Sequence, residues 1–275
     1  MKEYILPILI FLGFGALSGI LLLIASKVLA VKTDETEAKI TEALPGANCG
    51  GCGYSGCAGY AAAVAHDGAP TNLCKPGGAD VMKKINAIMG TEGGEFIREV
   101  AYVRCNGCEK ATKDRFTFTG TKSCAAVEKF YNGKGECRFG CDGYGDCVAV
   151  CGNDAITITD GVAVVDPAKC GGCGKCVTVC PNHLIFLRKE TSTVALRCSS
   201  KDSGKVTRTV CTNGCIGCKI CEKKCPHGAV IVADNHAVID YDKCTSCGTC
   251  VSACPRKCLV NITCTHSEKT EQADN

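Results

Sequence analysis

Twenty-seven of the 275 residues are cysteines, and most of them stand at fixed intervals. Three runs share the spacing C-x2-C-x2-C-x3-C followed by proline. They consist of Cys170, Cys173, Cys176 and Cys180; Cys215, Cys218, Cys221 and Cys225; and Cys244, Cys247, Cys250 and Cys254. In such a run three thiolates surround one face of a cubane iron–sulfur cluster, and the fourth reaches a neighbouring cluster. The spacing therefore predicts iron–sulfur clusters, and with them electron transfer.

A disulfide scaffold or a set of zinc sites would also use many cysteines, but both fit this pattern less well. Disulfide scaffolds are typically short and secreted, whereas this chain is long and its 27 cysteines are an odd number. Zinc commonly binds paired C-x-x-C knuckles. A zinc site uses four ligands in two pairs, so it does not need three evenly stepped cysteines with a remote fourth.

The composition indicates a fold that depends on its metal. Tryptophan is absent and aromatic residues make up 5% of the chain. Each cysteine-rich unit is then too small to close a large apolar core, and cluster binding is expected to supply much of the folding free energy. The net charge of +3, without a basic stripe and interleaved aromatics, argues against nucleic-acid binding.

An uncharged apolar stretch, Tyr4 to Ser26, predicts a membrane helix. Its residues would span roughly 34 Å, enough to cross a bilayer core. Lys27 and Lys32 follow it, against Lys2 before it, so the positive-inside rule places the rest of the chain in the cytoplasm. A cleaved signal peptide is the alternative, but the stretch is long and no small-residue cleavage site follows. We therefore expect residues 1–32 to be a single-pass anchor.

Residues 33–92 form a separate unit with four cysteines, Cys49, Cys52, Cys57 and Cys74. Four cysteines within 26 residues suit one cluster. The glycines between Cys49 and Gly53 let the backbone approach a cluster closely. Ala58–Ala65 is rich in alanine and predicts a short helix.

Two ferredoxin-like repeats are predicted, at 132–190 and 210–262. In both, 19 positions separate one cysteine run from the next, Cys151 to Cys170 and Cys225 to Cys244. A hairpin fills each interval, with the turns Asp160-Gly161 and Asp234-Asn235, whose residues tolerate positive φ. The intervening segments are predicted as a linker (93–131), a connector (191–209) and a polar tail (263–275). The expected fold class is α+β: a transmembrane helix, a small four-cysteine domain and two tandem two-cluster modules.

In the two-cluster pattern the fourth cysteine of each run binds the other cluster. The second repeat then groups Cys215, Cys218, Cys221 and Cys254, and separately Cys225, Cys244, Cys247 and Cys250. The first repeat groups Cys151, Cys170, Cys173 and Cys176, which leaves Cys137, Cys141, Cys147 and Cys180. The run that starts at Cys137 is irregular, because it is four residues longer than the standard one and is followed by Gly152 instead of proline. Five 4Fe–4S clusters are expected in all.

Seven cysteines remain: Cys105, Cys108, Cys124, Cys198, Cys211, Cys258 and Cys264. The first three, with Cys198 or Cys211, are candidates for a sixth site that binds iron–sulfur or zinc. The alternative is that they are buried thiols in a reducing cytoplasm. The chain has no Rossmann glycine fingerprint, no Walker sequence and no recognisable flavin motif, so no catalytic residue is predicted.

The chain resembles the B subunit of the Rnf complex over nearly its whole length. The resemblance rests on residues 44–78, on Cys137–Cys147 and on Gly214–Cys221. Two tandem repeats are similar to the longer form found in anaerobic bacteria. The resemblance implies an electron-transfer subunit of an ion-translocating ferredoxin:NAD oxidoreductase in the inner membrane of a bacterium. Reduced ferredoxin would be the donor, integral membrane and flavin-bearing subunits the partners, and Na+ or H+ the transported ion.

Two other functions also fit a chain with several clusters. One is a polyferredoxin that feeds a hydrogenase or a heterodisulfide reductase, although the Cys49–Cys74 unit argues against it. The other is a scaffold whose metals only hold the fold. Basic residues around the second repeat suggest a docking face for an acidic ferredoxin, with an ordinary mixed-charge surface as the alternative. They are Lys219, Lys223, Lys224, Lys243, Arg256 and Lys257.

Overall fold

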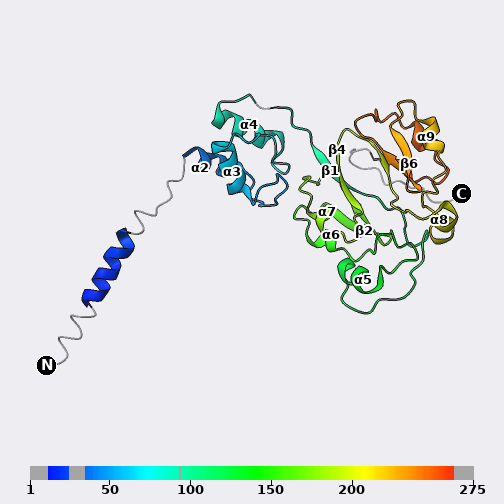
Figure 1. The fold of residues 1–275 in the computed structure, drawn as a ribbon, viewed down its shortest axis with the longest axis horizontal. Coiled ribbons are helices and arrows are strands. Elements are labelled where there is room, and N and C mark those ends of the chain that lie inside the picture. The colour runs from blue at the N-terminus through cyan, green and yellow to red at the C-terminus, as the bar shows by residue number, and fades with distance from the viewer. Residues whose placement is uncertain (1–11, 25–34, 93, 263–275) are drawn as a thin grey trace.

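The computed structural model describes residues 12–24, 35–92 and 94–262 (Figure 1). Residues 12–24 are helical, and the Ser18 hydroxyl donates to the Phe14 carbonyl at 2.7 Å. Across the described ranges, no helix has both the length and the apolar character needed to cross a membrane. The remainder of the predicted anchor, residues 1–11 and 25–32, lies outside the described residues.

Three helices build the four-cysteine domain: α2 (Glu35–Ala43), α3 (Cys57–His66) and α4 (Gly78–Met89). The predicted alanine-rich helix is confirmed as α3. Ile40, Tyr60 and Ile85 form the centre of a small core. The Tyr60 hydroxyl donates to the Pro70 carbonyl at 2.6 Å and accepts from the Leu73 N–H at 3.2 Å. These two bonds hold the chain in place just before Cys74.

The first ferredoxin-like module is enclosed by β1 (Glu99–Val103) and β4 (Ile185–Lys189), which pair antiparallel. Between them lie α5 (Cys124–Tyr131), α6 (Asp146–Ala149), β2 (Ile156–Thr159), β3 (Val162–Val165) and α7 (Lys175–Val179). The predicted hairpin is confirmed as β2–β3. Its turn residues Asp160 and Gly161 have φ of 48° and 78°, the two-residue turn that suits the twist of a hairpin.

The second module repeats this order of elements. It contains β5 (Val194–Leu196), α8 (Gly204–Val210), α9 (Ile220–Lys224), β6 (Val230–Ala233), β7 (His236–Ile239), α10 (Thr249–Ser252) and β8 (Leu259–Asn261). β6 and β7 form the second predicted hairpin, and β5 pairs antiparallel with β8. Asp234 and Asn235 in the hairpin turn have φ of 46° and 62°. The α+β class is therefore confirmed.

The segments predicted as a linker and a connector contribute strands to the modules. β1 lies within residues 93–131 and pairs with β4, while β5 lies within 191–209 and pairs with β8. Each module thus gains an outer strand pair beside its central hairpin. A two-stranded hairpin alone is marginally stable in water, so this second pair supports the small fold.

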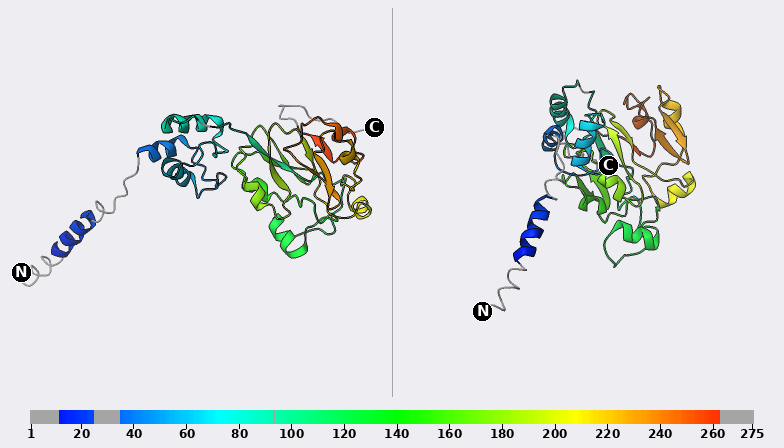
Figure 2. Two further views of the ribbon diagram at one scale, coloured as in Figure 1. Left: turned by 45° about the horizontal axis from the view of Figure 1, so that its top comes forward. Right: turned by 60° about the vertical axis from the view of Figure 1, so that its left-hand side comes forward.

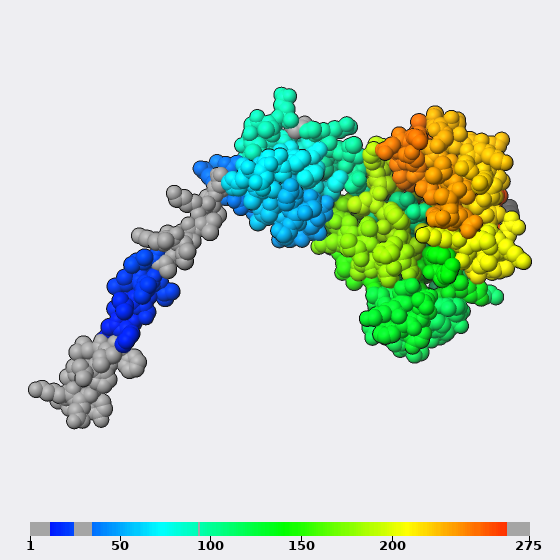
Figure 3. Space-filling view, in the orientation of Figure 1, coloured from blue at the N-terminus to red at the C-terminus, as the bar shows by residue number. Residues whose placement is uncertain are grey.

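The four-cysteine domain lies against the first module, and the second module lies beyond it (Figures 2 and 3). A Cβ added to Gly51 would lie 2.9 Å from the Cys173 carbonyl oxygen, so the two backbones are in contact. The two modules touch through the hydroxyls of Tyr241 and Tyr102, 3.3 Å apart, and through the Arg138–Asp202 ion pair. The three cysteine-rich units therefore form a row.

Candidate iron–sulfur sites

The four cysteines of the N-terminal domain are neighbours. Burial raises the pKa of the Cys74 thiol, and the thiolates of Cys57, Cys49 and Cys52 raise it further. A Cβ on Gly77 would meet Val81 at 2.7 Å and the Cys74 sulfur at 3.0 Å, so the backbone approaches this thiol as only glycine allows. The predicted set therefore comes together in space.

The three regular runs share one loop conformation. In each, the residues on both sides of the second cysteine have positive φ: Gly172 and Gly174, Gly217 and Lys219, and Ser246 and Gly248. The second member of each pair is the N-cap residue of helix α7, α9 or α10, which begins at the next residue. Lys219 and Ser246 adopt this conformation although it costs a non-glycine residue about 1–2 kcal/mol. The loop geometry, and not the preference of single residues, thus sets the backbone here.

A local hydrogen bond also recurs at the last cysteine of a run. The backbone N–H four residues later donates to the sulfur of Cys151, Cys180 and Cys225 at 3.4, 3.4 and 3.3 Å. Such N–H donors stabilise the charge on a cluster thiolate and tune its potential.

Both predicted sets in the second module come together. Cys215, Cys218, Cys221 and Cys254 line one cavity of about 330 Å³, which Cys258 also lines. In the other set, burial raises the pKa of Cys250, and the thiolates of Cys244, Cys225 and Cys247 add to the rise. Cys218 and Cys247 are the exposed cysteines in the described part of the chain.

The set around Cys170 in the first module also comes together. Cys151, Cys170, Cys173 and Cys176 line a cavity of about 890 Å³ that Cys49 of the four-cysteine domain shares. Burial raises the pKa of Cys176 to about 12, with the Cys170 and Cys173 thiolates as the next contributions. This site therefore faces the neighbouring domain.

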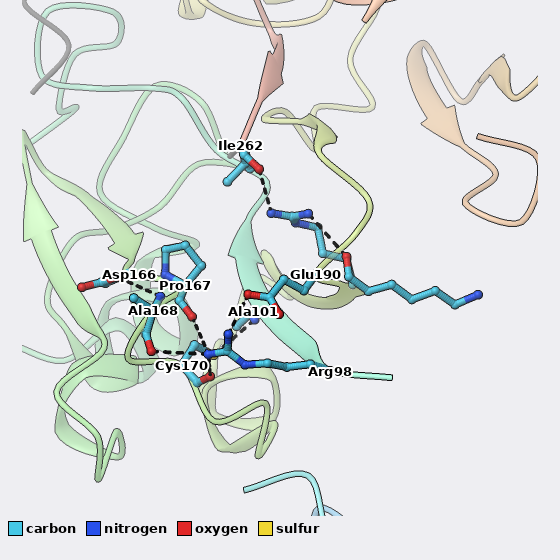
Figure 4. Close-up of polar contacts among 10 residues, drawn as sticks. Arg98, Ala101, Asp166, Pro167, Ala168, Cys170, Glu190 and Ile262 are labelled. Carbon is cyan, nitrogen blue, oxygen red and sulfur yellow. Dashed lines mark hydrogen bonds and ion pairs between the residues drawn. The ribbon is translucent and has the colours of Figure 1, made fainter. Parts of the chain in front are cut away.

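Arg98 fixes the approach to Cys170 (Figure 4). Its guanidinium pairs with Glu190 at 2.6 Å and donates to three carbonyl oxygens, those of Pro167, Ala168 and Cys170, at 2.9, 3.3 and 3.2 Å. The Ala101 N–H on β1 donates to the Cys170 sulfur at 3.4 Å. The β1–β4 pair thus supports the loop that carries the first cysteine of this run.

The last predicted set differs from what the structure brings together. Cys141, Cys147 and Cys180 line a cavity of about 390 Å³, but the fourth thiol in it is Cys124 and not Cys137. Burial raises the pKa of Cys124, and hydrogen bonds from the backbone N–H groups of Asp146, Tyr144 and Gly145 oppose the rise. Because these donors belong to the 141–147 loop, the Cys124 sulfur lies against that loop. Cys137 lies in a separate cavity with Cys105, Cys198 and Cys211.

The 141–147 loop explains why Cys124 is needed. Gly143 and Gly145 have φ of 70° and 83°, like Gly172 and Gly174 at 67° and 77°. The regular run therefore begins at Cys141, and Tyr144 stands where the other runs have their second cysteine. A run counted from Cys137 is four residues too long for this reason. The glycine spacing was the signal in the sequence that pointed to Tyr144; no local signal pointed to Cys124.

Asp146 holds Cys124 beside this loop. Its carboxylate accepts hydrogen bonds from the Ser123 hydroxyl and from the backbone N–H groups of Cys124 and Ala125, each at 2.9 Å. Burial opposes ionisation, but these donors outweigh it and lower the pKa of Asp146. A charged acceptor at the start of α5 is also favoured by the helix dipole.

Cys258 occupies a core position in the second module. The Arg197 N–H donates to the Cys258 carbonyl at 2.7 Å, as the Arg104 N–H does to the Leu184 carbonyl at 2.7 Å in the first. Cys258 thus corresponds to Leu184, although its sulfur also lies 3.5 Å from that of Cys254. Cys264 lies outside the described residues.

The donor sets suit iron–sulfur clusters. Each brings four thiols close to one another, and thiolate is the ligand that such clusters use. None of the described cysteines forms a disulfide, and nowhere in the described ranges do three Cys, His, Asp or Glu side chains converge as one metal ion would require.

Comparisons with protein families identify iron–sulfur domains along most of the chain. Residues 44–76 match the FeS model, described as "Putative Fe-S cluster". Residues 169–229 and 214–259 match two models described as "4Fe-4S dicluster domain", and 132–191 match the "LdpA Fe-S cluster-binding domain". The 169–229 match joins runs from different modules, whereas the structure packs α6 against α7 and α9 against α10.

Three relatives match the chain over nearly its whole length. The B subunit of the ion-translocating oxidoreductase complex of Methanosarcina acetivorans is 42% identical over 248 residues, 90% of this chain and 94% of that protein. The B subunit of the Na(+)-translocating ferredoxin:NAD(+) oxidoreductase complex of Acetobacterium woodii is 42% identical, with 94% and 78% covered. The proton-translocating counterpart of Clostridium ljungdahlii is 35% identical, with 93% and 91% covered. The chain carries multiple iron–sulfur clusters and belongs to the family of Rnf complex B subunits, the electron-transfer proteins of ion-translocating oxidoreductase complexes.

Proposed function

We propose that the chain conducts electrons within a membrane complex that couples electron flow from reduced ferredoxin to NAD with the translocation of Na+ or H+. The names of its relatives state this activity for their complexes, one moving Na+ and one protons. Reduction of NAD belongs to flavin-bearing partner subunits, and integral membrane subunits move the ion. The N-terminal helix anchors the chain in the cell membrane, with the cluster domains on the cytoplasmic side.

The proposed ligands of five 4Fe–4S clusters follow the spatial sets. They are Cys49, Cys52, Cys57 and Cys74; Cys151, Cys170, Cys173 and Cys176; Cys124, Cys141, Cys147 and Cys180; Cys215, Cys218, Cys221 and Cys254; and Cys225, Cys244, Cys247 and Cys250. When bound, each cluster supplies a centre that gains and loses one electron. The residues of the chain hold the clusters in a row and exclude water from most of them.

The observation that carries this function is the contact between successive sites. Cys49 and Cys173, from different domains, line one cavity. The Cys147 thiolate, from the other set of the first module, is close enough to Cys176 to raise the pKa of its thiol, after the larger effects of burial and of the Cys170 and Cys173 thiolates. Electrons thus have a short route from the first module to the four-cysteine domain.

Exposure supports input of electrons at the second module. Cys218 and Cys247 are exposed, so two sites there approach the surface that a soluble donor can reach. Lys219, Lys223 and Lys224 are exposed beside them. Two other members of the predicted basic face are already engaged: Arg256 donates to backbone carbonyls, and Lys243 pairs with Asp240 at 3.4 Å. Lys257 is exposed.

The order of transfer is tested by Cys57→Ala in the assembled complex, with the exposed Lys84→Ala on α4 as the control. Reduced ferredoxin should still bleach the clusters of both modules in Cys57→Ala, while reduction of the downstream flavins stops. Lys84→Ala should behave as the unmodified chain. Normal flavin reduction in Cys57→Ala would refute the proposed order.

A further inference from the structure

Four of the cysteines outside the five sets gather in a cavity between the two modules. Cys105, Cys137, Cys198 and Cys211 line a space of about 360 Å³, close in size to the spaces of about 390 and 330 Å³ at two of the proposed cluster sites. A Cβ on Gly107 would lie 3.5 Å from the Cys105 sulfur and 3.7 Å from the Cys211 sulfur. Two thiols from different modules therefore face one another across this glycine.

The four thiols are related by the internal repeat. Cys141 corresponds to Cys215 and Cys180 to Cys254, each 74 positions later, and the same offset relates Cys137 to Cys211. Arg104-Cys105 and Arg197-Cys198 follow β1 and β5, and both arginine N–H groups donate to equivalent carbonyls at 2.7 Å. Each module thus supplies the same two cysteines, and the pair of modules completes a set of four.

The site lies next to a cluster position of each module. The Cys215 N–H donates to the Cys198 sulfur at 3.2 Å, and Cys215 itself belongs to a set in the second module. On the other side, burial raises the pKa of Cys105 to about 11, and a hydrogen bond from the Cys141 backbone N–H opposes the rise. Since Cys141 belongs to a set in the first module, Cys105 lies beside that set.

Positive charge lies beside the cavity. Arg104 and Arg197, both half-buried, line it; the Arg104 guanidinium stacks on Phe186, 4.8 Å from the ring centroid, and its Nε is buried without a hydrogen-bond partner. Burial lowers the pKa of Arg197, and the Cys105 thiolate opposes that change. A buried cationic N–H without a partner is costly, and an anionic group in the cavity offsets that cost. A cluster with four thiolate ligands is such a group.

Polar contacts between the modules hold the cavity in shape. The Thr212 N–H donates to the Ala111 carbonyl at 2.8 Å, and the Asn213 side chain donates to the Asn106 carbonyl at 2.9 Å. Within the second module, Arg256 donates to the Cys211 carbonyl at 2.8 Å. The loop after Cys105 is thereby fastened to the loop that carries Cys211.

We propose that Cys105, Cys137, Cys198 and Cys211 hold a sixth 4Fe–4S cluster that connects the two modules. It accepts one electron from the Cys215 site and passes one electron to the Cys141 site, so it returns to its oxidised state after each transfer. Of the cysteines suggested by sequence for a sixth site, Cys124 belongs to the first module instead. Cys108 lies near Cys211, but Lys201 stands at its equivalent position in the second module, so it is outside the symmetric set.

This cluster extends the proposed electron path, but iron content tests it independently of that path. The anaerobically prepared full chain should contain about 24 iron atoms and as many sulfides, six times four. Cys137→Ser/Cys198→Ser, which removes one ligand from each module, should contain about 20. The control Cys108→Ser should keep the full number.

Several results would overturn the proposal. The unmodified chain could contain only about 20 iron atoms, or the double variant could keep about 24. Cys108→Ser could lose about four iron atoms, or the unmodified chain could hold one zinc ion that the double variant lacks. If the double variant does not fold, the counts of the unmodified chain and of Cys108→Ser still decide. A chain with five clusters and normal flavin reduction would overturn the sixth cluster alone and leave the proposed function standing.

Discussion

Replacing Cys124 by serine should remove one cluster from the first module, about four iron atoms and four sulfides per chain. The expectation follows from the cavity that Cys124 shares with Cys141, Cys147 and Cys180. A ligand set counted along the sequence from Cys137 predicts the opposite, because Cys124 would then be dispensable. The two assignments therefore differ in the outcome of one substitution.

A second substitution should restore that cluster. Tyr144 lies between Gly143 and Gly145, whose φ values of 70° and 83° match the loop in which Cys173 stands. Tyr144→Cys in the Cys124→Ser background would recreate a regular run. Loss of the ring removes the contact with Phe118, 5.9 Å between centroids, and that with the Lys134 ammonium, 5.5 Å away. These are worth about 0.5–1.5 and about 0.5–1 kcal/mol, so the double variant should recover its iron but remain about 1–2.5 kcal/mol less stable.

Iron and sulfide analysis, with EPR of the dithionite-reduced chain, measures both steps. Tyr144→Ser in the Cys124→Ser background is the matched control, because it removes the same ring and adds no thiol. It should stay about four iron atoms short. A full iron count in Cys124→Ser, or equal recovery with serine and cysteine at position 144, would show that Cys124 is not the missing ligand.

Three further substitutions test the supports of the clusters and the donor surface. Gly143→Ala should destabilise the first module by about 2–4 kcal/mol and lower its thermal midpoint. The added Cβ would lie 2.5 Å from the Gly161 carbonyl oxygen, on a backbone with φ of +70°. Gly152 has open space around it, so Gly152→Ala should leave the thermal midpoint unchanged. Arg98→Met should cost about 1–3 kcal/mol and make the Cys170 cluster easier to extract with a chelator. Arg138→Met loses an ion pair with Asp202 and a contact with the Phe139 ring; it should cost about 1 kcal/mol and leave the extraction rate unchanged. Equal extraction rates in the two variants would contradict this. Lys223→Glu/Lys224→Glu should slow the reduction of the chain by ferredoxin about tenfold or more at low salt. The control Lys83→Glu/Lys84→Glu on α4 carries the same charge change and should leave this rate unchanged. Reduction rates that do not depend on ionic strength would refute the docking surface.

Regular spacing was sufficient to predict the second module, since its eight proposed cluster ligands lie in two unbroken runs and its hairpin fills the interval between them. The four-cysteine domain was equally readable, because all its thiols lie between Cys49 and Cys74 and α3 has a clear alanine signal. These features depend on local sequence. Short-range geometry in a metal-binding loop is set by the ligands and the glycines beside them.

Pairings over a long distance could not be predicted in the same way. Nothing in residues 99–103 or 194–196 indicates that β1 and β5 pair with strands that follow the last cysteine of their modules. Cys124 reaches its site because Asp146 fixes the start of α5, a contact between residues 22 apart. The two-sided set of Cys105, Cys137, Cys198 and Cys211 exists only where the modules meet. Such contacts arise from packing, and in the sequence the cysteines that make them stand alone, outside the regular runs.

The exchange of cysteine for tyrosine at position 144 alters which molecules can reach the path of electrons. In the second module the equivalent thiol, Cys218, comes from within the run and is exposed. In the first, Tyr144 takes that surface position, packs against Phe118, and leaves the thiol to Cys124 at the start of α5. A donor that docks on the first module therefore meets an aromatic ring and not a cluster edge. Under the proposed function, this exchange insulates the middle of the row from a soluble donor and leaves the second module, where Cys218 and Cys247 are exposed, for the input of electrons.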